Sequence, residues 1–133
     1  MKITGWDDEN IYFSDGSRIT YTHEQDCCEV NYADFSVLDI FYDKENPVEF
    51  ESYNIKSIDA GFLLYLNGDP LSKQFDVLFP YAELMLSTSK AKIFIPCYSE
   101  QNGYYSSLVN IIVYDAKGNV VDRDIVGCQE IIC

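Results

Sequence analysis

Basic residues are scarce in this chain. Its 133 residues include 9 lysines and arginines against 22 aspartates and glutamates, which gives a formal net charge of −13 at pH 7. The electric field of such a molecule repels phosphate backbones and anionic lipid headgroups. The sequence therefore argues against direct nucleic-acid binding and against attachment to a membrane surface.

Long apolar segments are also missing. The first seven residues lack the apolar run of about 7–15 residues that a secretory signal needs, and no window approaches the roughly 20 apolar residues that cross a bilayer. We therefore expect a cytoplasmic protein with no membrane partner.

The cysteines lack a pairing pattern. There are 5 of them, an odd number, and none forms a Cys-x-x-Cys pair. A closed disulfide framework is therefore not predicted, and reduced thiols are. Where such thiols are buried, they behave as small apolar side chains.

Hydrophobic residues, by contrast, are plentiful. They make up 47% of the chain, and 11 tyrosines and 8 phenylalanines dominate its aromatic content. A disordered chain would not contain so many hydrophobic and aromatic residues. At this length we expect one domain covering residues 1–133, and no repeat or flexible linker divides it.

The hairpin around Asp15-Gly16 is the best-specified element. Runs rich in β-branched and aromatic residues flank the turn on both sides, which indicates two strands. A two-residue turn would place Ile11 and Ile19 on opposite faces, whereas a three-residue loop with Gly16 in the left-handed conformation pairs them on one face. We therefore predict the three-residue loop, and the same alternation points His23 inward.

Further short apolar runs predict more strands. The run 62–66 is apolar on both faces and should be central in a sheet, as should 108–114. Pro96 cannot donate to a ladder, so the strand 91–98 should lie at an edge or contain a bulge. The predicted strands beyond the first hairpin are 2–6, 48–53, 62–66, 75–81, 91–98, 108–114 and 120–126, the last two forming a hairpin.

Residues 36–44 predict a short helix. Apolar side chains fall at helical spacing there, Ser36 is a suitable N-cap, and Asp39 would lie in the first turn. A further helical turn is predicted at 83–86. With many short strands and turns, the chain is expected to form an α+β fold: a single compact domain with a predominantly antiparallel β-sheet and one or two short helices.

One loop concentrates the reactive side chains. It holds the only histidine and two adjacent cysteines among carboxylates. Its candidate functional residues are His23, Asp26, Cys27, Cys28 and Glu29.

A zinc site could use His23, Asp26 and one of the two adjacent cysteines, completed by distant thiols at Cys97, Cys128 or Cys133. Two adjacent cysteines on extended backbone point to opposite faces, however, and no second half-site with spaced ligands exists. We therefore assign no metal ligand and no cofactor.

A catalytic thiol could instead pair with His23 as its base. The nearby carboxylates Glu24, Asp26 and Glu29 should raise a thiol pKa, and no basic group or glycine-rich turn is close enough to hold an oxyanion. We therefore name no catalytic residue. The favoured interpretation is structural: His23 braces the loop, and one cysteine packs inward.

The run His23-Glu24-Gln25-Asp26-Cys27-Cys28-Glu29, preceded by Asp15-Gly16 and an aromatic strand, resembles the signature of an uncharacterised domain family of phages and bacteria. The resemblance covers residues 10–40, and the family's acidic, leucine-containing segment is not evident beyond Asp34. It implies a phage or prophage origin and supplies no activity.

Two further features suggest contact with a protein. Tyr98, Tyr104 and Tyr105 bracket a polar loop and could form a contact surface. The acidic excess could mimic a phosphate backbone and occupy the basic site of a partner protein. We therefore expect a non-enzymatic protein-binding domain. One alternative is a metal- or thiol-dependent site at His23, Cys27 and Cys28, and the other is an acidic mimic of a nucleic acid.

Overall fold

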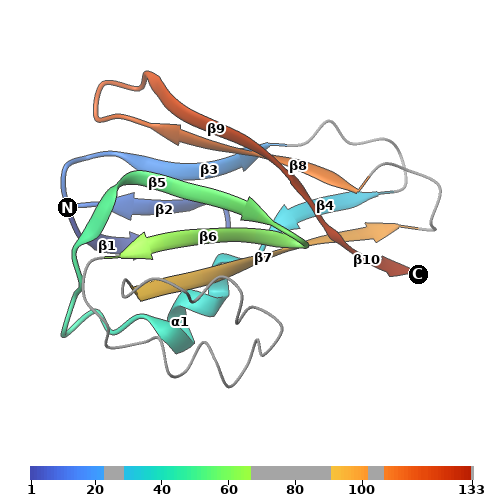
Figure 1. Cartoon of the computed structure of the whole chain (residues 1–133), viewed down its shortest axis with the longest axis horizontal. Helices are drawn as coiled ribbons and strands as arrows, with labels where there is room; N and C mark the ends of the chain where they lie inside the picture. The colour runs from blue at the N-terminus through green and yellow to red at the C-terminus, as the bar shows by residue number, and fades with distance from the viewer. Residues whose placement is uncertain (23–28, 67–90, 102–106, 133) are drawn as a thin grey trace.

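The computed structural model describes residues 1–22, 29–66, 91–101 and 107–132, which form two β-sheets and one short helical segment (Figure 1). The first sheet has the order β1-β2-β3-β8-β9 and the second the order β10-β7-β6-β5, with β4 also paired to β7. The strands are β1 (Ile3–Trp6), β2 (Asn10–Phe13), β3 (Arg18–Thr22), β4 (Val30–Ala33), β5 (Phe50–Ile58), β6 (Gly61–Leu66), β7 (Ala91–Gln101), β8 (Leu108–Tyr114), β9 (Val120–Gly127) and β10 (Gln129–Ile132).

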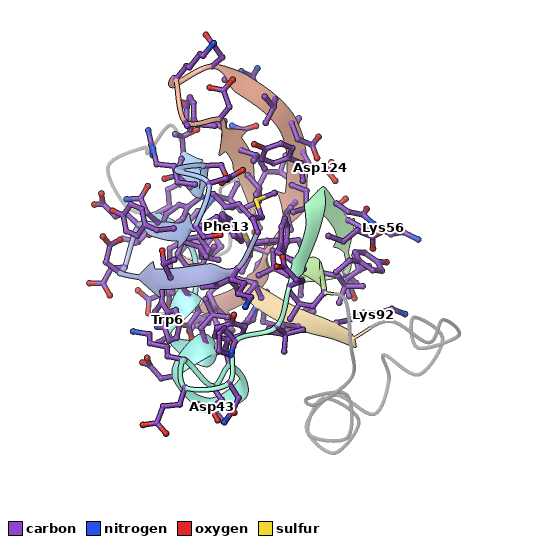
Figure 2. All side chains as sticks on the ribbon, turned by 90° about the vertical axis from the view of Figure 1, so that its left-hand side faces the viewer. Trp6, Phe13, Asp43, Lys56, Lys92 and Asp124 are labelled. Carbon is purple, nitrogen blue, oxygen red and sulfur yellow. The ribbon has the colours of Figure 1, made fainter. Side chains whose placement is uncertain are left out.

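The predicted fold class is confirmed. The chain is a single compact domain, and among the described strands every pairing is antiparallel except the parallel pair of β10 with β7. The two sheets bury their apolar faces against each other, and Phe13 of β2 lies in the interior between them (Figure 2). Its ring centroid is 4.6 Å from that of Phe50, the first residue of β5. Aromatic contacts of this kind hold the sheets together.

The first hairpin has the predicted loop. Ile11 pairs with Ile19, and both side chains are fully buried. The backbone N–H of Phe13 donates to the carbonyl of Ser17 at 3.0 Å, which closes a three-residue loop. Gly16 has a φ of +88°, a conformation that side chains with a Cβ rarely adopt.

The predictions for the two apolar strands also hold. β6 lies between β5 and β7, and β8 lies between β3 and β9, so both strands are central. The turn between β8 and β9 closes with Gly118 at a φ of +85°. Strand β10 was not predicted, because its four residues carry too little pattern.

The edge prediction for the strand with Pro96 is wrong for β7 as a whole. β6 pairs with residues 91–96 of β7, while β4 and β10 flank its second half. The carbonyl of Pro96 accepts from Asp34 at 2.8 Å, while the next N–H, that of Cys97, donates to Ala60 on the opposite side. The N–H and C=O groups of one strand residue point to the same side of the strand. The nitrogen of Pro96, which has no hydrogen to donate, therefore points toward the end of β4, and the sheet loses no hydrogen bond there.

The strand predicted at 48–53 is shifted. β5 spans Phe50–Ile58, and its register against β6 slips between Phe50 and Ile55, where Tyr53 has a positive φ of 49°. Such a bulge bends a strand. The bent strand contacts the first sheet at two places. The Phe50 N–H donates to the carbonyl of Met1, just before β1, at 2.5 Å, and the Ser57 N–H donates to the Asp124 carboxylate of β9 at 3.2 Å.

The predicted helix is shorter and begins differently. A 3₁₀ turn, η1 (Phe35–Val37), leads directly into α1 (Leu38–Phe41), and the N-cap is Asp34, not Ser36. The Asp34 carboxylate accepts from the backbone N–H of Ser36 at 3.0 Å, so aspartate takes the capping role that we assigned to the following serine. Asp39 lies in the first turn of α1, as predicted.

The predicted strand at 75–81 and the helical turn at 83–86 lie outside the described residues. Within the described part of the chain, no helix has the length and apolarity that would let it cross a membrane.

Candidate functional site

The loop singled out by the sequence lies between β3 and β4. Its residues His23, Asp26, Cys27 and Cys28 lie outside the described residues, so the inward orientation of His23 stays a prediction. Glu29 is described and is only 4% exposed. The two strands that flank this loop both contribute to a cleft, β3 through Tyr21 and β4 through Tyr32 and Ala33, and this cleft is the candidate site.

The cleft has a volume of about 250 Å³. It forms where β4 leaves the second sheet and the chain enters η1, opposite the end of β3 and the turn between β1 and β2. The lining residues combine aromatic rings with acidic and hydroxyl side chains: Asp8, Tyr21, Tyr32, Ala33, Asp34, Phe35 and Ser36.

Tyr21 forms one wall of the cleft. Its ring packs edge-on against Phe35, with centroids 5.7 Å apart and planes at 72°. Its hydroxyl donates to the backbone carbonyl of Asp8 at 3.1 Å, which ties β3 to the turn between β1 and β2. Burial raises the pKa of Tyr21, and the negative charges of Glu9 and Asp8 raise it further. The phenol therefore stays neutral at physiological pH.

Asp34 lines the cleft at the start of η1. Its backbone N–H donates to Pro96 of β7 at 2.8 Å, and its side chain accepts from the N–H and the hydroxyl of Ser36. The carboxylate is therefore held in place by the cap of the helical segment. A fixed carboxylate needs little reorganisation to meet a positive charge.

Tyr32 connects the cleft to Tyr98, one of the three tyrosines predicted as a contact surface. The two are direct cross-strand partners on β4 and β7, with ring centroids 5.8 Å apart. Burial raises the pKa of Tyr32, followed by the charges of Glu100 and Asp34. Tyr98 is half-buried, so it serves partly as packing. Tyr104 and Tyr105 lie outside the described residues.

A buried polar network lies behind the cleft. The Ser99 hydroxyl donates to Asn31 at 2.5 Å and accepts from the Gln101 amide at 2.6 Å. Gln101 also donates to Ser107 at 3.1 Å, and Ser107 donates to the Glu130 carboxylate at 2.7 Å. These bonds join four strands or strand ends, so they position the second half of β7 and, with it, Tyr98 and Glu100.

Metal binding finds no support in the described part of the chain. No group of three or more histidine, cysteine, aspartate or glutamate side chains is arranged there to hold an ion. The hypothesis of a metal site at the loop 23–29 concerns residues that are mostly outside that part.

Sequence reasoning named Tyr98, which packs against the cleft residue Tyr32, and did not identify the cleft itself. Neither Tyr21 nor Asp34 was singled out as a candidate site residue. The signal that could have found them is the capping pattern Asp34-x-Ser36 directly after an aromatic strand. The sequence contains no indication that the turn carrying Asp8 lies opposite.

Comparison of the chain with family models, with curated proteins and with solved structures gives no match, so the resemblance based on residues 23–29 stays a prediction.

Proposed function

We propose that this chain is a small non-enzymatic protein-binding domain whose cleft accepts a lysine or arginine side chain from a basic segment of a partner. The observation that carries the proposal is the combination of neutral tyrosine rings, Tyr21 and Tyr32, with two carboxylates, Asp8 and Asp34, around one cleft. Aromatic faces and carboxylates are the two groups that attract a cationic side chain.

The size of the cleft supports a single inserted side chain. Pockets for drug-sized ligands span about 300–1,000 Å³, and this cleft has about 250 Å³. A long side chain with an aliphatic stem and a charged tip fits such a space, because the stem can lie along the rings while the tip meets the carboxylates.

The charge of the whole molecule supports the same partner. A net charge of −13 attracts a basic segment over a distance and speeds its encounter. The cleft adds a specific contact to this general attraction. The experiment must therefore separate the two effects.

The alternative of an acidic nucleic-acid mimic requires carboxylates in rows on one face. Asp43 lies near the lower end of the molecule in Figure 2 and Asp124 in its upper half, so the two carboxylates are far apart in this view. Each is also engaged locally, Asp43 by the Asn46 side chain and Asp124 by the backbone of Ser57. This distribution favours the cleft over an extended acidic surface.

The test measures binding of a fluorescent hexalysine peptide and a fluorescent hexaarginine peptide by anisotropy. Asp34→Asn removes the charge at the cleft but keeps an oxygen that can cap η1. We expect this variant to bind at least one of the peptides about 2–5-fold more weakly, which corresponds to roughly 0.4–1 kcal/mol for one partly exposed charge pair.

Asp122→Asn on β9 is the matched control, because it changes the net charge equally but lies away from the cleft. We expect this variant to bind like the unmodified protein. Equal weakening by both substitutions would mean that only net charge matters and would overturn the proposal, as would tight binding unaffected by Asp34→Asn.

A further inference from the structure

The corner between β9 and β10 brings two cysteines together. β9 belongs to the first sheet and β10 to the second, and only Cys128 separates them, so the chain changes sheets at this residue. Figure 1 shows β9 crossing the molecule and continuing into β10 beside the end of β7. Cys97 lies on β7, directly before the residues that pair with β10.

The register places the two cysteines side by side. Gln129 pairs with Tyr98 in the parallel ladder of β10 and β7. Because the strands are parallel, the residues that precede this pair, Cys128 and Cys97, lie opposite each other. Neighbouring strands lie about 4.8 Å apart. Disulfides span Cα separations of about 4.4–6.8 Å, so this spacing needs no movement of the backbone.

The side chains also point to the same face. Ser99 and Gln101 follow Cys97 at alternate positions of β7, and all three are buried. Glu130 follows Cys128 at the alternate position of β10 and reaches the same polar network through Ser107 and Gln101. Since alternate strand residues share a face, Cys97 and Cys128 face each other.

We propose that Cys97 and Cys128 are a redox modification site, and that they form a disulfide when the protein meets a small disulfide oxidant such as oxidised glutathione. This inference is independent of the cleft. It goes beyond the expectation that buried thiols behave as small apolar side chains.

The exposure of the two thiols indicates which of them reacts first with the oxidant. Cys128 is half-buried, whereas Cys97 is fully buried in the core. A hydrogen bond from the Cys97 thiol lowers the pKa of Cys128, and the same contact together with burial raises the pKa of Cys97. Cys128 is therefore the attacking thiolate.

The exchange balances in two steps. The Cys128 thiolate attacks one sulfur of oxidised glutathione, the S–S bond breaks, and one glutathione thiolate leaves with the proton that Cys128 released. The mixed disulfide no longer carries the negative charge of Cys128, which raises the pKa of Cys97 in addition to the hydrogen bond between the two residues and burial. Cys97 then loses its proton and attacks the Cys128 sulfur, which releases the second glutathione thiolate to take up that proton.

The test oxidises the chain of residues 1–133 with oxidised glutathione and maps disulfides by mass spectrometry of a non-reduced digest. We expect a peptide pair joined through Cys97 and Cys128. We also expect the midpoint of thermal unfolding to rise by roughly 5–15 °C on oxidation and to return with a reductant, because the bond closes a loop in the unfolded chain.

Cys128→Ala should abolish both the linkage and the rise in midpoint. The matched control is Cys133→Ser, which removes a thiol near the same end of the chain and should preserve both. The proposal is overturned if Cys97 remains a free thiol after oxidation, if either thiol pairs mainly with another cysteine, or if the rise in midpoint persists in Cys128→Ala.

Discussion

The indole N–H of Trp6, at the end of β1, donates a hydrogen bond to the carboxylate of Asp39 on α1 at 2.8 Å. The Lys44 ammonium lies 4.1 Å from the centre of the same indole ring. These contacts attach the helical segment to the first sheet. Because α1 follows η1 directly, they also tie the segment that carries Phe35 and Ser36 of the cleft to β1.

Asp39→Ala should lower the free energy of unfolding by about 0.5–1.5 kcal/mol, because the indole loses its acceptor. Asp39→Asn keeps an acceptor oxygen and should cost less. Urea unfolding followed by the fluorescence of the single tryptophan measures both effects at the contact itself. Glu45→Ala serves as the control, and unfolding of Asp39→Ala at the same urea concentration as this control would contradict the prediction.

Gly61→Ala should destabilise the protein by roughly 1–3 kcal/mol through overpacking. A Cβ at this position would lie 2.4 Å from the carbonyl oxygen of Ile95 and 2.7 Å from the ring of Phe94. Gly127→Ala is the matched control, since its Cβ would meet no atom within 4 Å. Thermal unfolding of the two variants should give a clearly lower midpoint for Gly61→Ala, and equal midpoints would refute this account of the close approach.

Ser99→Ala should cost about 1–3 kcal/mol, because it removes one hydrogen-bond partner from both Asn31 and Gln101 in a buried network. Ser107→Ala should cost less, because Gln101 keeps its bond to Ser99, and the other partner, Glu130, is exposed and can bind water instead. Denaturant titration of both variants checks the order. The reverse order would show that the network derives its stability from its exposed end.

Asp115→Asn should reduce the amount by which the free energy of unfolding falls when the pH is lowered. The N–H of Asn119 donates to the Asp115 carboxylate at 2.9 Å, as does that of Lys117, and these bonds hold its pKa below the ordinary value near 3.8. Because the folded-state pKa is the lower one, this contribution is complete above about pH 4 and is lost as the pH falls through the folded-state pKa.

The measurement is urea unfolding at several pH values between about 6 and 2. The difference in stability between the unmodified protein and Asp115→Asn should shrink in acid, because only the aspartate loses its charge. A constant difference over this range would mean that the charge of Asp115 contributes nothing to the turn between β8 and β9.

Local patterns were sufficient for the elements whose partners are close in sequence. The loop at Gly16 was predictable because alternation on both strands leaves one register that buries Ile11 with Ile19. The central positions of β6 and β8 were predictable because both faces are apolar. The helical cap was assigned two residues too late, since Asp34 and Ser36 are both good caps and the choice depends on the bond between Asp34 and Pro96.

The sequence by itself determined an acidic, mostly antiparallel single domain, because composition and alternation act residue by residue. Only the tertiary structure decided which distant segments meet. Asp8 and Asp34 line the same cleft, and Cys97 lies beside Cys128, although each pair comes from segments far apart in the chain. Pro96 is central in the sheet and not at its edge for the same reason: the strand that ends beside it, β4, lies more than 60 residues earlier in the chain, and no local pattern encodes such a contact.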